Sequence, residues 1–302
     1  MKTYKHIKKL FTLITIILFS CSQKNTETIN FREKNNPASN YELIYESGNW
    51  NHPNYTKAFE SYGNHRVVIQ TTDLSNNITQ AIIPWRRRDN HPNEKDIIIV
   101  DAKSNTVVDN KYIIEINNEF GHLIFKPNKE SNTYYVYFLP HSSTGGYYPK
   151  LKYNEPKESL DKSWLSEVKL ILETISNLSK TKIISIQSID DFHSFYPMEV
   201  IATKKEVSKF INNYPKDYYL FPEYRENAIK MVDFLPFRWI SETKKINGIS
   251  DNVFKGEFYS FQIGVFSPNK RLENIDINFL DFKNKSGYKI KKEMITCFNK
   301  VG

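Results

Sequence analysis

Short stretches of alternating apolar and polar residues follow one another between residues 41 and 153. Successive side chains of a strand point to opposite faces, so this two-residue period is typical of half-buried β-strands. Turn-forming pairs such as Asn76-Asn77 and Gly145-Gly146 separate several of the stretches. The pattern predicts strands over residues 65–70, 78–85, 96–101, 111–117, 122–126 and 133–139. We therefore predict a mainly β chain whose first folded domain, residues 41–155, is a β-sandwich.

The period of the pattern changes after residue 160. Apolar residues now recur at intervals of three and four, which places them on one face of a helix. They are Trp164, Val168, Ile171, Leu172, Ile175 and Leu178. We predict an amphipathic helix over residues 163–180 and a strand over residues 182–189, which together form a connecting segment at 156–188.

A second β-rich (α+β) domain, which looks incomplete, is predicted over residues 189–302. Thr203 and Glu206 have the spacing of a capping box, which marks the start of a helix that ends before Pro215. Alternating residues predict strands at 257–266 and 274–281. We also expect a strand at 289–298, with exposed apolar surface near Ile295 and Phe298 that a following domain would cover.

The first twenty residues have the pattern of an export signal. Four lysines precede an apolar run at 10–19, which is too short for a comfortable membrane span. The run ends in Leu18-Phe19-Ser20-Cys21, which is similar to the lipobox of bacterial lipoproteins. We predict a signal peptide at 1–20, lipid attachment at Cys21, a flexible tether at 21–40 and a lipoprotein anchored to a membrane of the bacterial cell envelope. The alternative is an ordinary secretory signal with a chance cysteine.

The charge of the chain is less informative than it first looks. The sequence has 42 basic and 34 acidic residues, a formal net charge of +8. The signal peptide holds four lysines and no acid, so its removal leaves +4. The remaining basic residues are interleaved with acids, which does not favour nucleic acid as a partner. The two cysteines and seven scattered histidines lack metal-ligand spacing, so we expect no metal and no cofactor.

The sequence contains no motif of a known catalytic centre, such as GxSxG, HExxH or a P-loop. Asp190 and Asp191 are neighbours, whose side chains point to opposite faces of a strand, so we interpret them as a strand-end turn. Glu223 and Glu226 are expected to form local ion pairs with Arg225 and Lys230. We therefore predict no catalytic residue in this chain.

Two clusters are candidate glycan contacts. Trp85, Arg86, Arg87 and Arg88 follow a predicted strand, and an aromatic plane beside guanidinium groups is able to hold a sugar. The alternative is structural: the arginines pair with acids such as Asp89 and Asp101, and Trp85 fills the core. Tyr147 and Tyr148 follow a glycine pair on a predicted loop and are the second candidate contact.

An ordered series of short motifs resembles the N-terminal region of glycoside hydrolase family 123. One example is Leu235-Pro236-Phe237-Arg238-Trp239-Ile240. The series comprises residues 62–68, 83–89, 135–141, 148–150, 192–199, 220–225, 235–240 and 256–265. The resemblance implies a β-N-acetylgalactosaminidase with a β-sandwich followed by a (β/α)₈ barrel, which carries the catalytic acid pair of a retaining, substrate-assisted mechanism.

The resemblance also implies that the catalytic part is missing. Residues 294–299 resemble the run into the barrel, but the sequence stops at Gly302, and a barrel needs about 250 residues. We therefore expect a non-catalytic N-terminal portion, truncated before the barrel, that supports glycan processing beside a separately encoded catalytic barrel. A stand-alone glycan-binding surface lipoprotein is the alternative, and an active glycosidase is a third. These alternatives differ in whether the chain is itself an enzyme.

Overall fold

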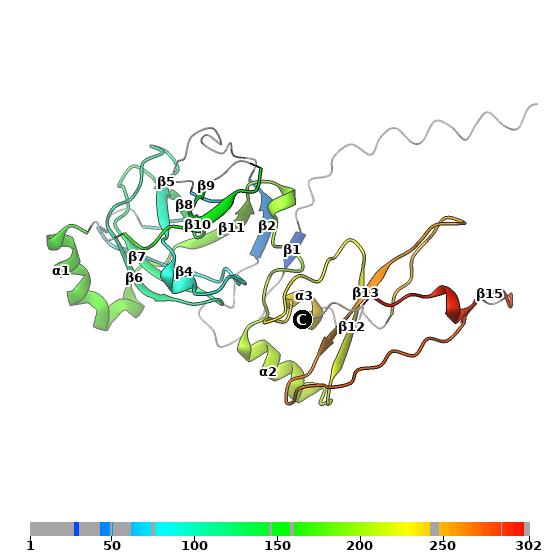
Figure 1. The fold of residues 1–302 in the computed structure, drawn as a ribbon. Coiled ribbons are helices and arrows are strands. Elements are labelled where there is room, and N and C mark those ends of the chain that lie inside the picture. Colours follow the sequence, from blue (N-terminus) through cyan, green and yellow to red (C-terminus); the bar gives the residue numbers. More distant parts are fainter. Residues whose placement is uncertain are drawn as a thin grey trace, which may run out of the picture.

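The computed structural model describes residues 27–29, 43–48, 50, 62–73, 76–144, 147–157, 160–241, 248–284 and 286–298. The chain is mainly β, with several sheets and a few short helices (Figure 1). The predicted signal peptide and Cys21 lie outside the described residues, as does the tether apart from strand β1 (Glu27–Ile29). No helix in the described part of the chain is long and apolar enough to cross a membrane.

A six-stranded sheet forms one layer of the first unit. Its strand order is β1, β2 (Leu43–Ser47), β11 (Lys182–Ser188), β3 (His65–Gln70), β8 (Thr133–Tyr137) and β5 (Ile98–Asp101). All neighbours are antiparallel except β2 and β11, which are parallel. Strand β11 comes from the predicted connecting segment, yet it lies between β2 and β3 inside this sheet.

A three-stranded sheet forms the opposite layer, with β7 (Gly121–Phe125) between β4 (Thr79–Ile83) and β6 (Lys111–Ile116). The two layers share one core, in which Val67, Ile69 and Val136 of the first sheet join Ala81 and Leu123 of the second. The predicted β-sandwich is therefore confirmed. A separate hairpin of β9 (His141–Thr144) and β10 (Lys150–Tyr153) extends from this unit.

The predicted amphipathic helix begins where expected but ends early. Asp161 caps α1 (Lys162–Ile171) by accepting a hydrogen bond from the Trp164 backbone N–H at 2.9 Å. Trp164 and Val168 pack on Ile78 and Ile124. The chain then continues as a 3₁₀ helix, η2 (Leu172–Asn177), with a kink at Thr174. The Thr174 hydroxyl donates to the carbonyl oxygen of Ile171 at 3.3 Å, which competes with a regular helical ladder.

The second unit contains η3 (Asp191–His193), α2 (Lys204–Asn213), β12 (Tyr219–Tyr224), α3 (Phe237–Ser241) and β13 (Phe261–Phe266). The predicted capping box is confirmed, because the Thr203 and Glu206 side chains each accept the other residue's backbone N–H. Strands β12 and β13 form an antiparallel pair. Their inner face packs against Phe210 of α2 and Trp239 of α3.

Three predicted strands need correction. Residues 274–281 form no strand, and the strand predicted from 257 begins only at Phe261. The strand predicted at 289–298 is reduced to β15 (Lys289–Ile290), which pairs with β14 (Phe282–Lys283) and is followed by η4 (Lys292–Met294). Alternation describes the two faces of a strand but supplies no partner for its backbone groups. In the described structure Ile275 and Ile277 remain exposed.

Candidate functional site

The arginine triplet lies where the chain leaves strand β4. Arg86 has a φ of 49°, in the left-handed region that few non-glycine residues adopt. This turn sends the three guanidinium groups to different partners. Trp85, Arg86 and Arg87 are buried, and Arg88 is partly exposed.

Arg86 connects the sandwich to helix α2. Its Nη1 and Nη2 each donate to a carboxylate oxygen of Glu206 at 2.7 Å, and Nη1 also donates to the carbonyl oxygen of Ile201 at 3.1 Å. Burial opposes ionisation of Glu206, but the hydrogen bonds and charge of Arg86 outweigh it, so the pKa of Glu206 is lowered. Glu206 therefore has two roles: it caps α2 and anchors the helix to the sandwich.

Arg87 is fully buried and holds the loop that follows it. Its Nε and Nη2 donate to the Asp89 carboxylate at 2.6 and 2.8 Å, and Lys95 Nζ donates to the same carboxylate at 2.5 Å. Burial alone would raise the pKa of Asp89. The hydrogen bonds and positive charges of Arg87 and Lys95 have the larger effect, so the pKa is lowered. The Asn118 side-chain amide fastens the loop by donating to the carbonyl oxygens of Arg87 and Asp89.

Arg88 forms the third ion pair, with Glu199. Glu199 is buried and also accepts a hydrogen bond from Lys230 Nζ at 2.8 Å. The Arg88 guanidinium carbon lies 5.7 Å from the ring centroid of Phe195. This cluster is a second connection between the sandwich and the chain that follows it.

These contacts decide how much of the triplet is able to face a glycan. Trp85, Arg86 and Arg87 are buried and therefore do not reach the surface. Their surroundings match the structural alternative, in which the arginines pair with acids and Trp85 fills the core. Asp89 is a partner of Arg87 as expected, whereas Asp101 instead accepts from the backbone N–H of Lys103. The predicted glycan contact is left to Arg88 and to the tyrosine pair.

Tyr147 and Tyr148 lie at the end of the β9–β10 hairpin and are 91% and 84% exposed. Their ring centroids are 5.0 Å apart and the ring planes are nearly perpendicular. Both rings therefore present apolar surface to solvent, as the loop prediction requires.

Sequence reasoning missed the role of Glu223. It is fully buried, accepts hydrogen bonds from Trp239 Nε1 at 3.0 Å and Arg238 Nε at 3.2 Å, and makes no ion pair with Arg225 or Lys230. The pairing expected for Glu226 with Arg225 is present at 3.4 Å. The alternation that places Tyr219 and Phe221 inward on β12 also places Glu223 inward. This alternation is the sequence signal that indicates the burial of Glu223.

Asp190 and Asp191 form the expected strand-end turn. Asp190 Oδ1 caps the short helix η3 by accepting from the backbone N–H of His193 at 2.9 Å. The His193 ring Nδ1 lies 2.6 Å from the same oxygen. Among the described residues there is no group of three or more His, Cys, Asp or Glu side chains placed to hold a metal ion.

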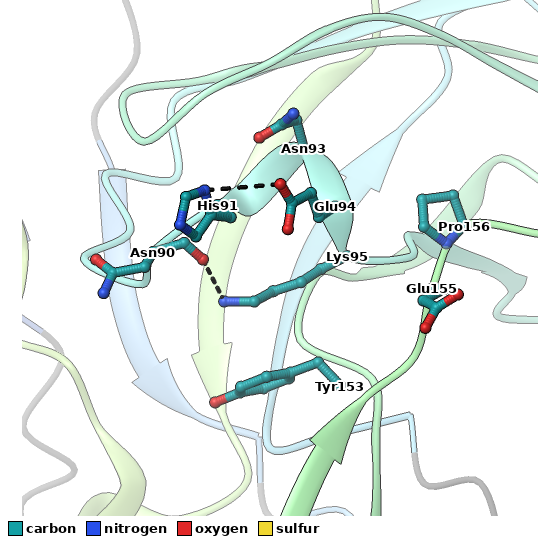
Figure 2. A pocket seen from close by; sticks show the side chains of 8 residues that line it. All are labelled: Asn90, His91, Asn93, Glu94, Lys95, Tyr153, Glu155 and Pro156. Atoms are coloured by element: carbon teal, nitrogen blue, oxygen red, sulfur yellow. Dashed lines mark hydrogen bonds and ion pairs between the residues drawn. The ribbon is translucent and has the colours of Figure 1, made fainter.

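A depression of about 620 Å³ lies beside the loop that Arg87 and Asp89 hold (Figure 2). Its walls come from residues 90–95, which include the short helix η1 (Pro92–Glu94), and from the end of β10. Figure 2 shows Lys95 reaching across the depression above Tyr153, with the Lys95 Nζ 4.4 Å from the ring centroid. The lining is polar and aromatic: Asn90, His91, Asn93, Glu94, Lys95, Tyr153, Glu155 and Pro156.

The fold and its internal ion pairs define a β-sandwich domain tied to a second, smaller unit. Comparison with protein families identifies the sandwich: residues 55–189 match the family model described as the glycoside hydrolase 123, N-terminal domain. The match includes strands β3 to β11. No curated protein and no solved structure matched the chain.

Proposed function

We propose that this chain is the non-catalytic scaffold of a glycan-processing protein of the glycoside hydrolase 123 type. The match to the N-terminal domain of that family supports the glycan-processing context. We also propose that a lipid on Cys21 anchors the protein to a membrane of the cell envelope, on the basis of the export signal and lipobox-like sequence. The proposal includes neither a nucleic-acid partner nor a cofactor.

The main support for the scaffold role is that the arginine triplet pairs with acidic residues inside the chain. The densest cluster of positive charge ends in ion pairs with Glu206, Asp89 and Glu199, all of this chain. Two of these pairs tie the sandwich to the residues that follow the family match. Buried charge pairs hold a fixed geometry, because removal of one partner leaves an uncompensated charge. A rigid connection of this kind is suited to a scaffold that holds another domain in position.

The neighbour that we propose is a separately encoded catalytic barrel. The outer face of the β12–β13 ribbon presents Leu220, Ile263 and Val265, each about half exposed, with Phe261 beside them. Both faces of this two-stranded ribbon are apolar, and among the described residues α2 and α3 cover one of them. A domain matching an N-terminal family model is expected to adjoin the rest of that family's architecture.

The test combines the full chain with a separately expressed barrel of the same family. We expect the chain alone to release no product from an aryl β-N-acetylgalactosaminide, and we expect it to co-elute with the barrel in size-exclusion chromatography. Co-elution should be lost in Ile263→Asp/Val265→Asp and kept in the matched control Asn278→Asp. Product release by the chain alone would overturn the non-catalytic role. Absence of co-elution, or co-elution that survives the double substitution, would overturn the docking.

A second candidate function is stand-alone glycan binding at the cell surface. The exposed Tyr147 and Tyr148 favour it, because aromatic rings that point into solvent offer flat apolar surface to a sugar ring. It differs from the scaffold role in requiring no catalytic partner.

A further inference from the structure

Hydrogen bonds within the chain hold Lys95 and the backbone of the loop that borders the depression beside strand β10. Lys95 Nζ donates to the Asp89 carboxylate and to the Asn90 carbonyl oxygen, the latter at 2.8 Å. The backbone N–H of Asp96 donates to the carbonyl oxygen of Asn154 at 2.8 Å, which ties this loop to the residue after Tyr153. A preformed site loses little conformational freedom when a ligand enters. The buried Arg87 acts here as a positioning residue through Asp89.

The side chains that line the depression offer both donors and acceptors. Asn90 and Asn93 are exposed, and neither side-chain amide forms a hydrogen bond with another described residue. Each amide is able to donate and to accept, while the carboxylates of Glu94 and Glu155 accept only. Hydroxyl groups also donate and accept, so a ligand rich in hydroxyls matches this set. The partly exposed ring of Tyr153 adds an apolar surface.

The charges of the depression disfavour an anion. Lys95 pairs with Asp89, a carboxylate that it shares with Arg87, and the ring Nδ1 of His91 lies 3.7 Å from the carboxylate of Glu94. Glu155 adds a further negative charge, with Lys152 3.9 Å away. The lining therefore places two carboxylates, those of Glu94 and Glu155, against the single ammonium group of Lys95, which opposes a sulfated or sialylated ligand.

We propose that this depression binds a neutral oligosaccharide. Sugar hydroxyls bond to Asn90, Asn93 and Glu94, and an apolar sugar face packs against Tyr153. The volume of about 620 Å³ lies within the range of small-ligand sites. Strand β10 carries Tyr153 and follows directly on Tyr147 and Tyr148, so a longer chain of sugars would meet these exposed rings along the hairpin. The inference rests on the proposed function, since it names the ligand class that a glycan-processing scaffold meets.

The experiment measures binding by the full chain. An array of neutral oligosaccharides and their sialylated counterparts identifies the strongest neutral binder, which is then titrated by calorimetry. We expect neutral binding only, and Asn90→Ala/Asn93→Ala should weaken it by about tenfold or more because two hydrogen-bonding groups are lost. Asn278→Ala, an exposed asparagine on the C-terminal segment, is the matched control and should bind like the parent. Thermal unfolding checks that every variant is folded.

Three results would overturn the inference: no neutral oligosaccharide binds, the double variant binds as well as the parent, or sialylated sugars bind better. If the double variant does not fold, Asn93→Ser alone provides the test, since it keeps a polar exposed side chain without the amide. A chain that binds no sugar but co-elutes with the catalytic barrel would overturn this inference and leave the proposed function standing. A chain that binds sugar through Asn93 and also hydrolyses it would overturn the proposed non-catalytic function and leave this inference standing.

Discussion

At the scale of single residues, burial changes the chemistry of side chains that look ordinary in the sequence. His65 lies on β3, and its ring stacks on Phe195 with centroids 3.8 Å apart. Its Nε2 lies 2.8 Å from the carbonyl oxygen of His193, so this nitrogen carries the proton of the neutral ring and donates it. Burial disfavours the cation and lowers the pKa of His65 to about 4. The alternation along the sequence predicted the strand but not the lowered pKa of His65.

The pKa of His65 predicts a pH-dependent stability. Between pH 6.5 and about 4 the unfolded chain binds a proton at this residue that the folded chain does not bind. The free energy of unfolding should therefore fall by about 3 kcal/mol as the pH drops through this window, and be fully retained above pH 6.5. Urea unfolding of the parent and of His65→Gln over pH 4–7 isolates the effect, because Asp89 and Glu206 titrate in both proteins. Equal pH slopes for the two proteins would contradict it.

At the scale of elements, both units use a strand glycine to seat a tryptophan. A Cβ atom on Gly121 of β7 would lie 2.1 Å from the Trp85 ring, and one on Gly264 of β13 would lie 2.2 Å from the Trp239 ring. No side chain fits at such distances without displacing the indole. The two tryptophans in turn contribute to the cores of the sandwich and of the second unit. Strand pairing and core packing are therefore linked at these two positions.

Overpacking at Gly121 should destabilise the sandwich. We expect Gly121→Ala to lower the free energy of unfolding by about 1–3 kcal/mol, because the new methyl group forces Trp85 from its position. In a double-mutant cycle, Trp85→Phe should reduce the cost of the alanine, since the smaller ring leaves space. Gly248→Ala, where a Cβ would contact nothing within 4 Å, is the control in urea unfolding. Additive costs at Gly121 and Trp85 would argue against the clash.

At the scale of the whole molecule, the two ends of the described structure differ in how well they are covered. The sandwich encloses a continuous core, whereas residues 248–298 expose many large apolar side chains. Phe298 is 88% exposed, which confirms the expected apolar surface at that residue, while Ile295 is half-buried. Weakly covered segments open at low free-energy cost.

Limited proteolysis should reveal this difference. Trypsin should cut first after exposed residues of the C-terminal segment, such as Lys283 and Lys289, and leave the sandwich as a stable core. Mass spectrometry of the fragments over time gives the order of cleavage. Binding of the catalytic barrel should slow these cuts. First cleavage within the sandwich, at Lys103 or Lys129 for instance, would contradict the prediction.

Most strand positions, the capping box of α2 and the sandwich class follow from the sequence, because alternation and local capping depend on residues close together in the chain. It did not reveal the place of β11 or the absence of a strand at 274–281, since a period states which face is apolar but not which strand lies alongside. The partners of Arg86, Arg88 and Glu223 are visible only in the folded chain. Charged side chains need partners when buried, but the fold chooses the partner: Glu206 is 120 residues from Arg86, and the partners of Glu223 come from helix α3 rather than from the neighbouring Arg225.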